Sequence, residues 1–140
     1  YQNEKTLLTL TCALGFGMAH ADAQPVTVII NSGSTMTQGI ALVLTTQMQA
    51  QGSQVQLLLC DKGADLALKG ATGEALKPNN VTPAQMLDGA MKKGATASIC
   101  ALYLPNVGRT PEDLKEGITV AKPDAMGKAV MDAQRKVLVF

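Results

Sequence analysis

The run Val-Thr-Val-Ile-Ile at residues 26–30 constrains the fold of this chain more than any other stretch. Branched apolar side chains follow one another there almost without a break, whereas a strand with one wet face alternates apolar and polar residues. Pro25 and Asn31 bound the run, so the expected strand is short. A strand of this kind is buried on both faces, which is typical of a parallel sheet with helices packed against it.

A helix and a second strand follow this first strand. The helix is expected over residues 36–51 and ends at Gly52. The second strand is expected over residues 54–60 and ends in Cys60. Strand, helix and strand joined by tight turns form a βαβ unit, for which we expect a right-handed crossover. The apolar residues of the helix fall at helical spacing: Ile40, Val43, Leu44 and Met48.

Strands and helices continue to alternate toward the middle of the chain. A short helix over residues 64–68 leads into an exposed loop over residues 69–80, which is rich in Gly, Lys, Asn and Pro. Thr82 and Pro83 are typical of the first residues of a helix, as cap and first helical position. A third strand is expected over residues 97–102. The helix before it is expected to bury Met86, Leu87, Ala90 and Met91.

Shorter elements complete the pattern. Thr110 and Pro111 start a short helix, and residues 118–121 form a brief extended piece. Another helix is expected over residues 123–134, and the last strand over residues 136–140. The inward residues of this last helix are expected to be Ala125, Met126, Ala129, Val130 and Ala133.

These elements predict one three-layer α/β domain over residues 25–140. Its sheet is expected to be mostly parallel, with four or five strands and helices on both faces, an arrangement of flavodoxin-like type. We find no internal repeat and no linker between domains in this range.

Residues 1–24 have the pattern of an export signal. Lys5 supplies a short positive region, residues 7–18 are an apolar run, and Ala19-His20-Ala21 has the small-x-small form of a cleavage site. The apolar run is too short to span a membrane comfortably. We therefore expect a mature protein that begins near Asp22 and works in the periplasm or outside the cell, without stable membrane association. The alternative is an N-terminal helix that stays attached to a cytoplasmic protein.

Composition and residue spacing exclude several function classes. The formal net charge is +1, the basic residues are scattered, and the aromatic residues are two Phe and two Tyr, so nucleic-acid binding is not expected. The cysteines, Cys12, Cys60 and Cys100, have no zinc-binding spacing. His20, the one histidine, would leave with the signal, which removes histidine chemistry from the mature domain.

Cys60 and Cys100 each fall at or near the carboxyl end of an expected strand, where open α/β sheets collect ligands and reactive groups. If the two strands are neighbours, both thiols face the same edge, and a disulfide requires Cα atoms within about 7 Å. Arg109 with the helix start behind it, and Lys62 beside Cys60, are cations of the kind that favour a reactive thiolate. The alternative for each cysteine is a small apolar residue in a buried strand. Nearby acidic residues are interpreted as caps and solvated turns: Asp61, Asp65, Glu112 and Asp113.

A second candidate site lies in two other segments. The turn at residues 31–35 precedes a helix, whose N-terminus can hold an anion. It lacks the Lys of a P-loop and the glycine fingerprint of a dinucleotide site, so the pattern favours a plain strand-to-helix turn over an anion site. Together with the loop at residues 69–80, this turn would form a non-catalytic module that binds a small anion or a protein. In that hypothesis both thiols are structural.

An ordered set of segments carries a family resemblance: Val-Thr-Val-Ile-Ile-Asn, Gln-Val-Gln-Leu-Leu-Leu-Cys-Asp-Lys-Gly-Ala, Met-Leu-Asp-Gly-Ala-Met-Lys-Lys-Gly-Ala, Ser-Ile-Cys-Ala, Leu-Lys-Glu-Gly-Ile-Thr-Val and a final Val-Leu-Val-Phe. In this order they resemble the DsrE/DsrF-like family of small sulfur-transfer and sulfur-relay domains. The resemblance covers nearly all of residues 25–140.

The resemblance implies a role for Cys100 as the residue that accepts a sulfane sulfur and holds it as a persulfide. It implies sulfur donor and acceptor proteins or polysulfide as partners, and a homo-oligomer such as a trimer or hexamer. It implies no metal and no organic cofactor.

Three functions follow as hypotheses. The first is a sulfur carrier of sulfurtransferase type, more a carrier than a turnover enzyme, in which Arg109 and helix amides stabilise the Cys100 anion. The second is the non-catalytic binding module described above. The third is a thiol–disulfide redox protein, because an exported member of the family can also be held oxidised as a Cys60–Cys100 disulfide.

Overall fold

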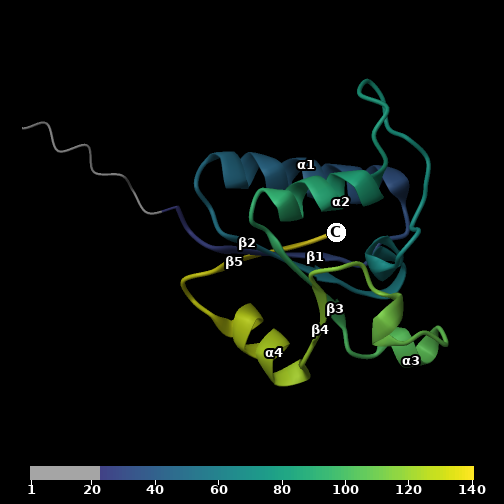
Figure 1. The fold of residues 1–140 in the computed structure, drawn as a ribbon. Coiled ribbons are helices and arrows are strands. Elements are labelled where there is room, and N and C mark those ends of the chain that lie inside the picture. Colours follow the sequence, from purple (N-terminus) through teal and green to yellow (C-terminus); the bar gives the residue numbers. More distant parts are fainter. Residues whose placement is uncertain (1–22) are drawn as a thin grey trace, which may run out of the picture.

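Five parallel strands form a single sheet in the part of the chain that the structure describes, residues 23–140 (Figure 1). The structure is a computed structural model. The strands are β1 (Val26–Ile30), β2 (Val55–Leu59), β3 (Thr96–Cys100), β4 (Ile118–Ala121) and β5 (Lys136–Val139). Their order across the sheet is β4-β3-β2-β1-β5, and every neighbouring pair is parallel. The predicted α/β class and parallel sheet are confirmed, with an order distinct from the 2-1-3-4-5 order of flavodoxin.

The direction of each crossover decides which face of the sheet a helix covers. Steps from β1 to β4 all run the same way across the sheet, and the step to β5 runs back past them. Right-handed crossovers then place α1 (Thr35–Ala50) and α2 (Pro83–Lys92) on one face and α4 (Pro123–Met131) on the other. Figure 1 shows this arrangement, with α1 and α2 above the sheet and α4 below it. The predicted three layers are therefore present.

The two faces of the sheet are covered unequally. Toward α1 and α2, the side chains of Val28, Leu57 and Ile99 are fully buried and pack in one cluster with Leu42 and Leu87. Such close-packed apolar burial is the main favourable contribution to folding.

The α4 face is different, because α4 buries none of its own residues. The predicted inward set on this helix is only partly right: Met126 and Ala129 are half-buried, whereas Ala125 and Ala133 are exposed and Val130 is 46% exposed. The helix also ends at Met131 and not at the predicted Gln134, because Asp132 takes an extended conformation.

The prediction for α1 is also corrected by the structure. Most of its apolar stripe faces outward, with Ile40 49% and Val43 42% exposed, whereas Met48 packs against the core. The buried face carries smaller and polar residues instead: Gln38, Gly39, Ala41, Leu42 and Thr45. Small residues allow a close approach, since a Cβ on Gly39 would collide with a methyl group of Leu76. The Thr45 hydroxyl donates to the Ala41 carbonyl at 2.9 Å and is therefore satisfied within the helix.

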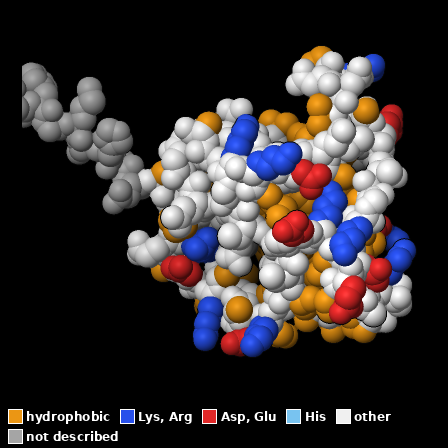
Figure 2. All heavy atoms as spheres, viewed as in Figure 1, with side chains coloured by type: hydrophobic (Ala, Val, Ile, Leu, Met, Phe, Trp, Pro, Cys, Tyr) orange, Lys and Arg blue, Asp and Glu red, His pale blue; other side chains and the backbone are white. Residues whose placement is uncertain are grey.

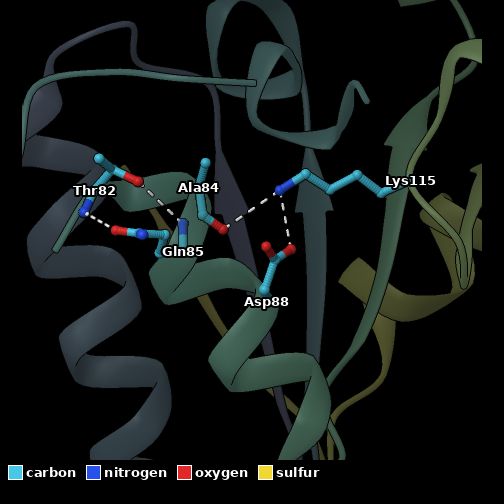
Figure 3. Close-up of polar contacts among 5 residues, drawn as sticks. All are labelled: Thr82, Ala84, Gln85, Asp88 and Lys115. Atoms are coloured by element: carbon cyan, nitrogen blue, oxygen red, sulfur yellow. Dashed lines mark hydrogen bonds and ion pairs between the residues drawn. The ribbon is translucent and has the colours of Figure 1, made fainter. Parts of the chain in front are cut away.

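The start of α2 follows the sequence prediction closely. Thr82 caps the helix, its side chain accepting from the Gln85 amide while the Gln85 side chain accepts from the Thr82 amide (Figure 3). This reciprocal pair is a capping box, and Pro83 occupies the first helical position. The loop at residues 69–80 is mostly exposed as predicted, and it projects above α1 and α2 in Figures 1 and 2.

Lys115 fastens the β3–β4 connection to α2. Its ammonium group lies 2.9 Å from an Asp88 carboxylate oxygen and donates to the Ala84 carbonyl at 3.4 Å (Figure 3). The Lys115 side chain is only 17% exposed, so this ion pair is better shielded from water than a surface pair.

A tight turn follows β2 and includes the 3₁₀ helix η1 (Asp61–Ala67), which replaces the short helix predicted over residues 64–68. Gly63 in η1 lies so close to β1 that a Cβ there would overlap the Ile30 carbonyl oxygen, with the carbonyl carbon 2.6 Å away. Both partners in this contact belong to the backbone, so no flexible side chain could move aside to make room for a Cβ. Gly63 therefore holds the turn against the carboxyl end of β1.

The connection after β3 differs from the prediction. The strand ends at Cys100, two residues before the predicted end, and a short helix that was not predicted, α3 (Tyr103–Asn106), follows it. Pro105 does not prevent this helix, because a proline is tolerated within the first turn. The predicted export signal, with Cys12 and His20, lies almost wholly outside the described residues.

We predict that Gly63→Ala lowers the free energy of unfolding by about 2 kcal/mol, the usual cost of overpacking a site that cannot relax. Urea unfolding followed by circular dichroism measures this change. Gly73→Ala is the matched control, because a Cβ at Gly73 meets nothing within 4 Å. Equal stability of the two variants would contradict the described contact.

We also predict that Lys115→Ala lowers the free energy of unfolding by about 1 kcal/mol, since it leaves Asp88 without its partner. Lys128→Ala is the control, because Lys128 forms an exposed ion pair with Asp124 at 3.9 Å on α4. Its unfolding curve should superimpose on that of the wild type, and a larger loss in the control than in Lys115→Ala would refute the assignment.

Candidate functional site

Cys60 and Cys100 are joined by a disulfide at the carboxyl edge of the sheet. The register of the sheet brings them together, because Leu59 lies opposite Ile99 in the parallel β2–β3 pair, and the next residue on each strand is a cysteine. The Cα atoms are 5.1 Å apart, within the range that a disulfide requires. Both residues are half-buried. The structure thus brings together two of the three predicted site residues.

The disulfide lines a cavity of about 370 Å³, which we call the cysteine pocket. Its walls come from η1 and from the α3 segment, and its remaining lining residues are Asp61, Lys62, Asp65, Leu102, Tyr103, Asn106 and Val107. Leu102 is 76% exposed and lies at the surface directly before α3. The pocket is therefore open to solvent and bordered by apolar surface.

A sharp backbone turn follows Cys60. Asp61 has φ +46°, a left-handed conformation that aspartate tolerates better than most residues. The turn sends the chain away from the strand immediately after the cysteine, so Cys60 lies at the end of the sheet and not within it.

Tyr103 and Asp65 form the polar wall of the cysteine pocket. The Tyr103 hydroxyl donates to an Asp65 carboxylate oxygen at 2.5 Å. Burial of the ring, together with this bond to a carboxylate, raises the pKa of Tyr103 well above its ordinary value. Tyr103 is therefore a neutral donor at physiological pH. Sequence reasoning missed this pair, although an aromatic residue three positions after Cys100 in an aromatic-poor chain was a usable signal.

Arg109, the third predicted site residue, lies outside the cysteine pocket. It follows α3 and pairs loosely with Asp113, at 3.8 Å between charged atoms. Its place is in an adjoining cavity of about 450 Å³, which we call the basic pocket. Lys62 lines both cavities and is the cation that borders the cysteines.

The basic pocket joins the two segments that the sequence singled out as a second candidate site. Gly33 lines it from the turn before α1, Thr35 from the first position of α1, and Lys69 to Gly73 from the loop. Lys62, Arg109 and the carboxylates of Asp65 and Asp113 complete the polar lining. Asp113 also caps the turn after Thr110, accepting from the Thr110 amide at 2.9 Å, as predicted for this acid.

Residues 23–140 contain neither a cluster of metal ligands nor a helix that could span a membrane. No three His, Cys, Asp or Glu side chains in that range gather as a metal site would require. No helix in that range has the length and apolar character needed to cross a bilayer.

Comparison with known proteins identifies the fold. No family model matches the chain, and no curated protein matches its sequence. Among solved structures, it is similar to the ychN protein from E. coli, with a TM-score of 0.66 and 19% identity over 84% of this chain and 99% of that one. It is also similar to MTH1491 from Methanobacterium thermoautotrophicum, a protein of unknown function, with a TM-score of 0.67 and 12% identity over the same shares.

The chain has the DsrE-like fold. This part of the predicted resemblance is confirmed. At such low identities the likeness extends to the fold alone, so the chemistry of the DsrE-like domain has to be argued from its own cysteines.

Reduction of the Cys60–Cys100 bond should lower the free energy of unfolding by about 4 kcal/mol, because the bond closes a long loop in the unfolded chain. Urea unfolding with and without a phosphine reductant measures the effect. The Cys60→Ala/Cys100→Ala double variant is the control and should not respond to the reductant. Alkylation of both cysteines by iodoacetamide in unreduced protein would show that the bond is absent.

Proposed function

We propose that this protein carries sulfane sulfur as a persulfide on Cys100, with Cys60 as the thiol that releases it. The observation that carries the proposal is the pairing of the two cysteines at the mouth of an open pocket. A structural disulfide needs no such pocket, whereas a carrier must admit its donor and acceptor. The resemblance to sulfur-relay domains supports the same role for Cys100.

The loading step is a transfer of one sulfur atom. With the pair reduced, the Cys100 thiolate attacks the outer sulfur of a persulfide donor, R–S–SH. The S–S bond of the donor breaks, R–S⁻ leaves with the electron pair, and Cys100 becomes Cys–S–SH. Lys62 is the nearby cation that would favour the thiolate in place of the predicted Arg109, because it lines the cysteine pocket.

The release step uses the second cysteine. An acceptor thiolate can take the outer sulfur directly, which regenerates the Cys100 thiolate. Alternatively, the Cys60 thiolate attacks the inner sulfur of the Cys100 persulfide, which forms the observed disulfide and expels HS⁻. In this route the two cysteine sulfurs are oxidised and the sulfane sulfur is reduced to sulfide. The exposed Leu102 beside the pocket offers contact area for an acceptor protein.

A thiol–disulfide redox protein is the second candidate function. The Cys60–Cys100 bond itself favours it, because a half-buried disulfide that borders an open pocket is accessible to an attacking thiolate. An oxidised pair also fits the predicted extracytoplasmic location, since disulfides persist in oxidising compartments. The homo-oligomer, the export signal, and the donor and acceptor partners stay predictions.

Polysulfide treatment of reduced protein tests the carrier role. We expect Cys60→Ser to gain and keep one sulfur atom on Cys100, because its resolving thiol is gone. The wild type should gain the sulfur transiently and then return to the disulfide, with release of sulfide. Thiol blocking, peptide mapping and mass spectrometry locate the added sulfur and separate it from any on Cys12.

Cys100→Ser is the matched control and should carry no stable persulfide at Cys60. If Cys60→Ser gains no sulfur on Cys100, the carrier role is wrong. If that variant instead forms mixed disulfides with small thiols and the wild type cycles between dithiol and disulfide, the redox function replaces it.

A further inference from the structure

The basic pocket holds more positive than negative charge. Lys62, Lys69 and Arg109 face two carboxylates, those of Asp65 and Asp113. The three cations come from three separate segments: η1, the loop after it and the segment behind α3. Their gathering around one cavity of about 450 Å³ is produced by the fold and not by a local run of basic residues.

The three cations form few strong ion pairs with the residues around them. Lys69 donates to a neutral carbonyl, that of Glu112, at 2.7 Å. Lys62 forms no ion pair with any residue between 23 and 140. Of the carboxylates, Asp65 already accepts from Tyr103, and Asp113 lies 3.8 Å from Arg109. An anion entering the pocket would therefore meet cations that have no strong competing partner.

The N-terminus of α1 adds to the positive electrostatic potential in the basic pocket. Thr35 lines the pocket at the first position of this long helix, whose N-terminus carries a partial positive charge. Gln38 also lines the pocket and is buried, and its amide nitrogen is held by the Ser32 carbonyl at 2.9 Å. Gly33 permits the approach of Lys62, since a Cβ there would lie 2.9 Å from the Lys62 Cβ. The pocket is thus shaped by residues fixed in place before any ligand arrives.

The basic pocket adjoins the cysteine pocket, because Lys62 and Asp65 line both. We propose that the basic pocket binds the oxyanionic group, carboxylate or sulfonate, of a low-molecular-weight sulfur compound whose sulfur atom reacts at the Cys60–Cys100 pair. This inference rests on the proposed reactivity of that pair and names the class of its substrate. One charged pocket beside one apolar pocket suits a small molecule with an acidic end and a sulfur end.

The reaction that tests this recognition is reduction of the disulfide by a small thiol. A thiolate R–S⁻ attacks one sulfur of the Cys60–Cys100 bond, which forms a mixed disulfide and releases the other cysteine as a thiolate. A second R–S⁻ attacks the mixed disulfide and gives R–S–S–R and the second cysteine thiolate. Two molecules of thiol are oxidised and one protein disulfide is reduced.

The experiment compares mercaptoethanesulfonate and mercaptopropionate with neutral mercaptoethanol at equal thiolate concentrations. We expect the acidic thiols to reduce the wild-type disulfide about tenfold faster at low salt, since a cationic pocket concentrates anions at the site. Added salt should shrink this preference. Sodium sulfate at constant ionic strength should inhibit the acidic thiols alone. The ratio of the reduction rates with mercaptoethanesulfonate and mercaptopropionate shows whether the pocket prefers a sulfonate or a carboxylate.

Charge-removing variants distinguish binding of the anion in the basic pocket from a general effect of the protein's net charge. Lys62→Gln and Arg109→Gln should each bring the preference for acidic thiols close to one, whereas Lys128→Gln on α4 should leave it unchanged although it removes the same charge. No preference in the wild type, or an equal loss in all three variants, would overturn the proposal. The carrier role is judged separately, because the stable gain of sulfur on Cys100 in reduced Cys60→Ser treated with inorganic polysulfide involves no acidic thiol.

Discussion

The parallel register between β2 and β3 is the constraint on which the rest of the site depends. It sets Leu59 opposite Ile99, and thereby Cys60 beside Cys100 at the edge of the sheet. A slip of one residue would turn Cys100 to the opposite face and separate the sulfurs. The register is fixed because Leu57, Leu59 and Ile99 must all point into the core beneath α1 and α2. The packing of the core therefore also fixes the position of the cysteine pair.

The two faces of the sheet differ in how much apolar surface the helices bury. The α1 and α2 face contains most of the fully buried apolar side chains, and their burial stabilises the domain. The α4 face and the α3 segment carry exposed apolar residues, among them Val130, Met131 and Leu102, and the outer surface of α1 carries others. Cys100 shares its face with Ser98 by strand alternation, away from the main core. The cysteines therefore lie away from the main core, where binding of a ligand would disturb little of the buried apolar packing.

Local patterns predicted the strands and the capped start of α2, because strand composition and capping boxes act within a few residues. They failed for α1, where a face of small residues packs more closely than the apolar stripe of Ile40 and Val43. No local pattern shows which strands are neighbours in the sheet. The sequence therefore predicted both cysteines at one edge but could not predict the distance between them. The prediction placed Arg109 at the cysteines because no local pattern predicts α3, the short helix with Pro105 that separates them.

The disulfide also divides the basic pocket between two parts of the chain. Lys62 and Lys69 lie within the segment that the bond closes, whereas Thr35 and Arg109 lie outside it. Opening the bond changes the freedom of one part only, so an anion that contacts both parts can bind the oxidised and reduced forms with different affinity. Thermodynamic linkage then requires the anion to shift the reduction potential of the cysteine pair by the same free energy. Occupancy of one pocket thereby becomes a control on the chemistry of the other.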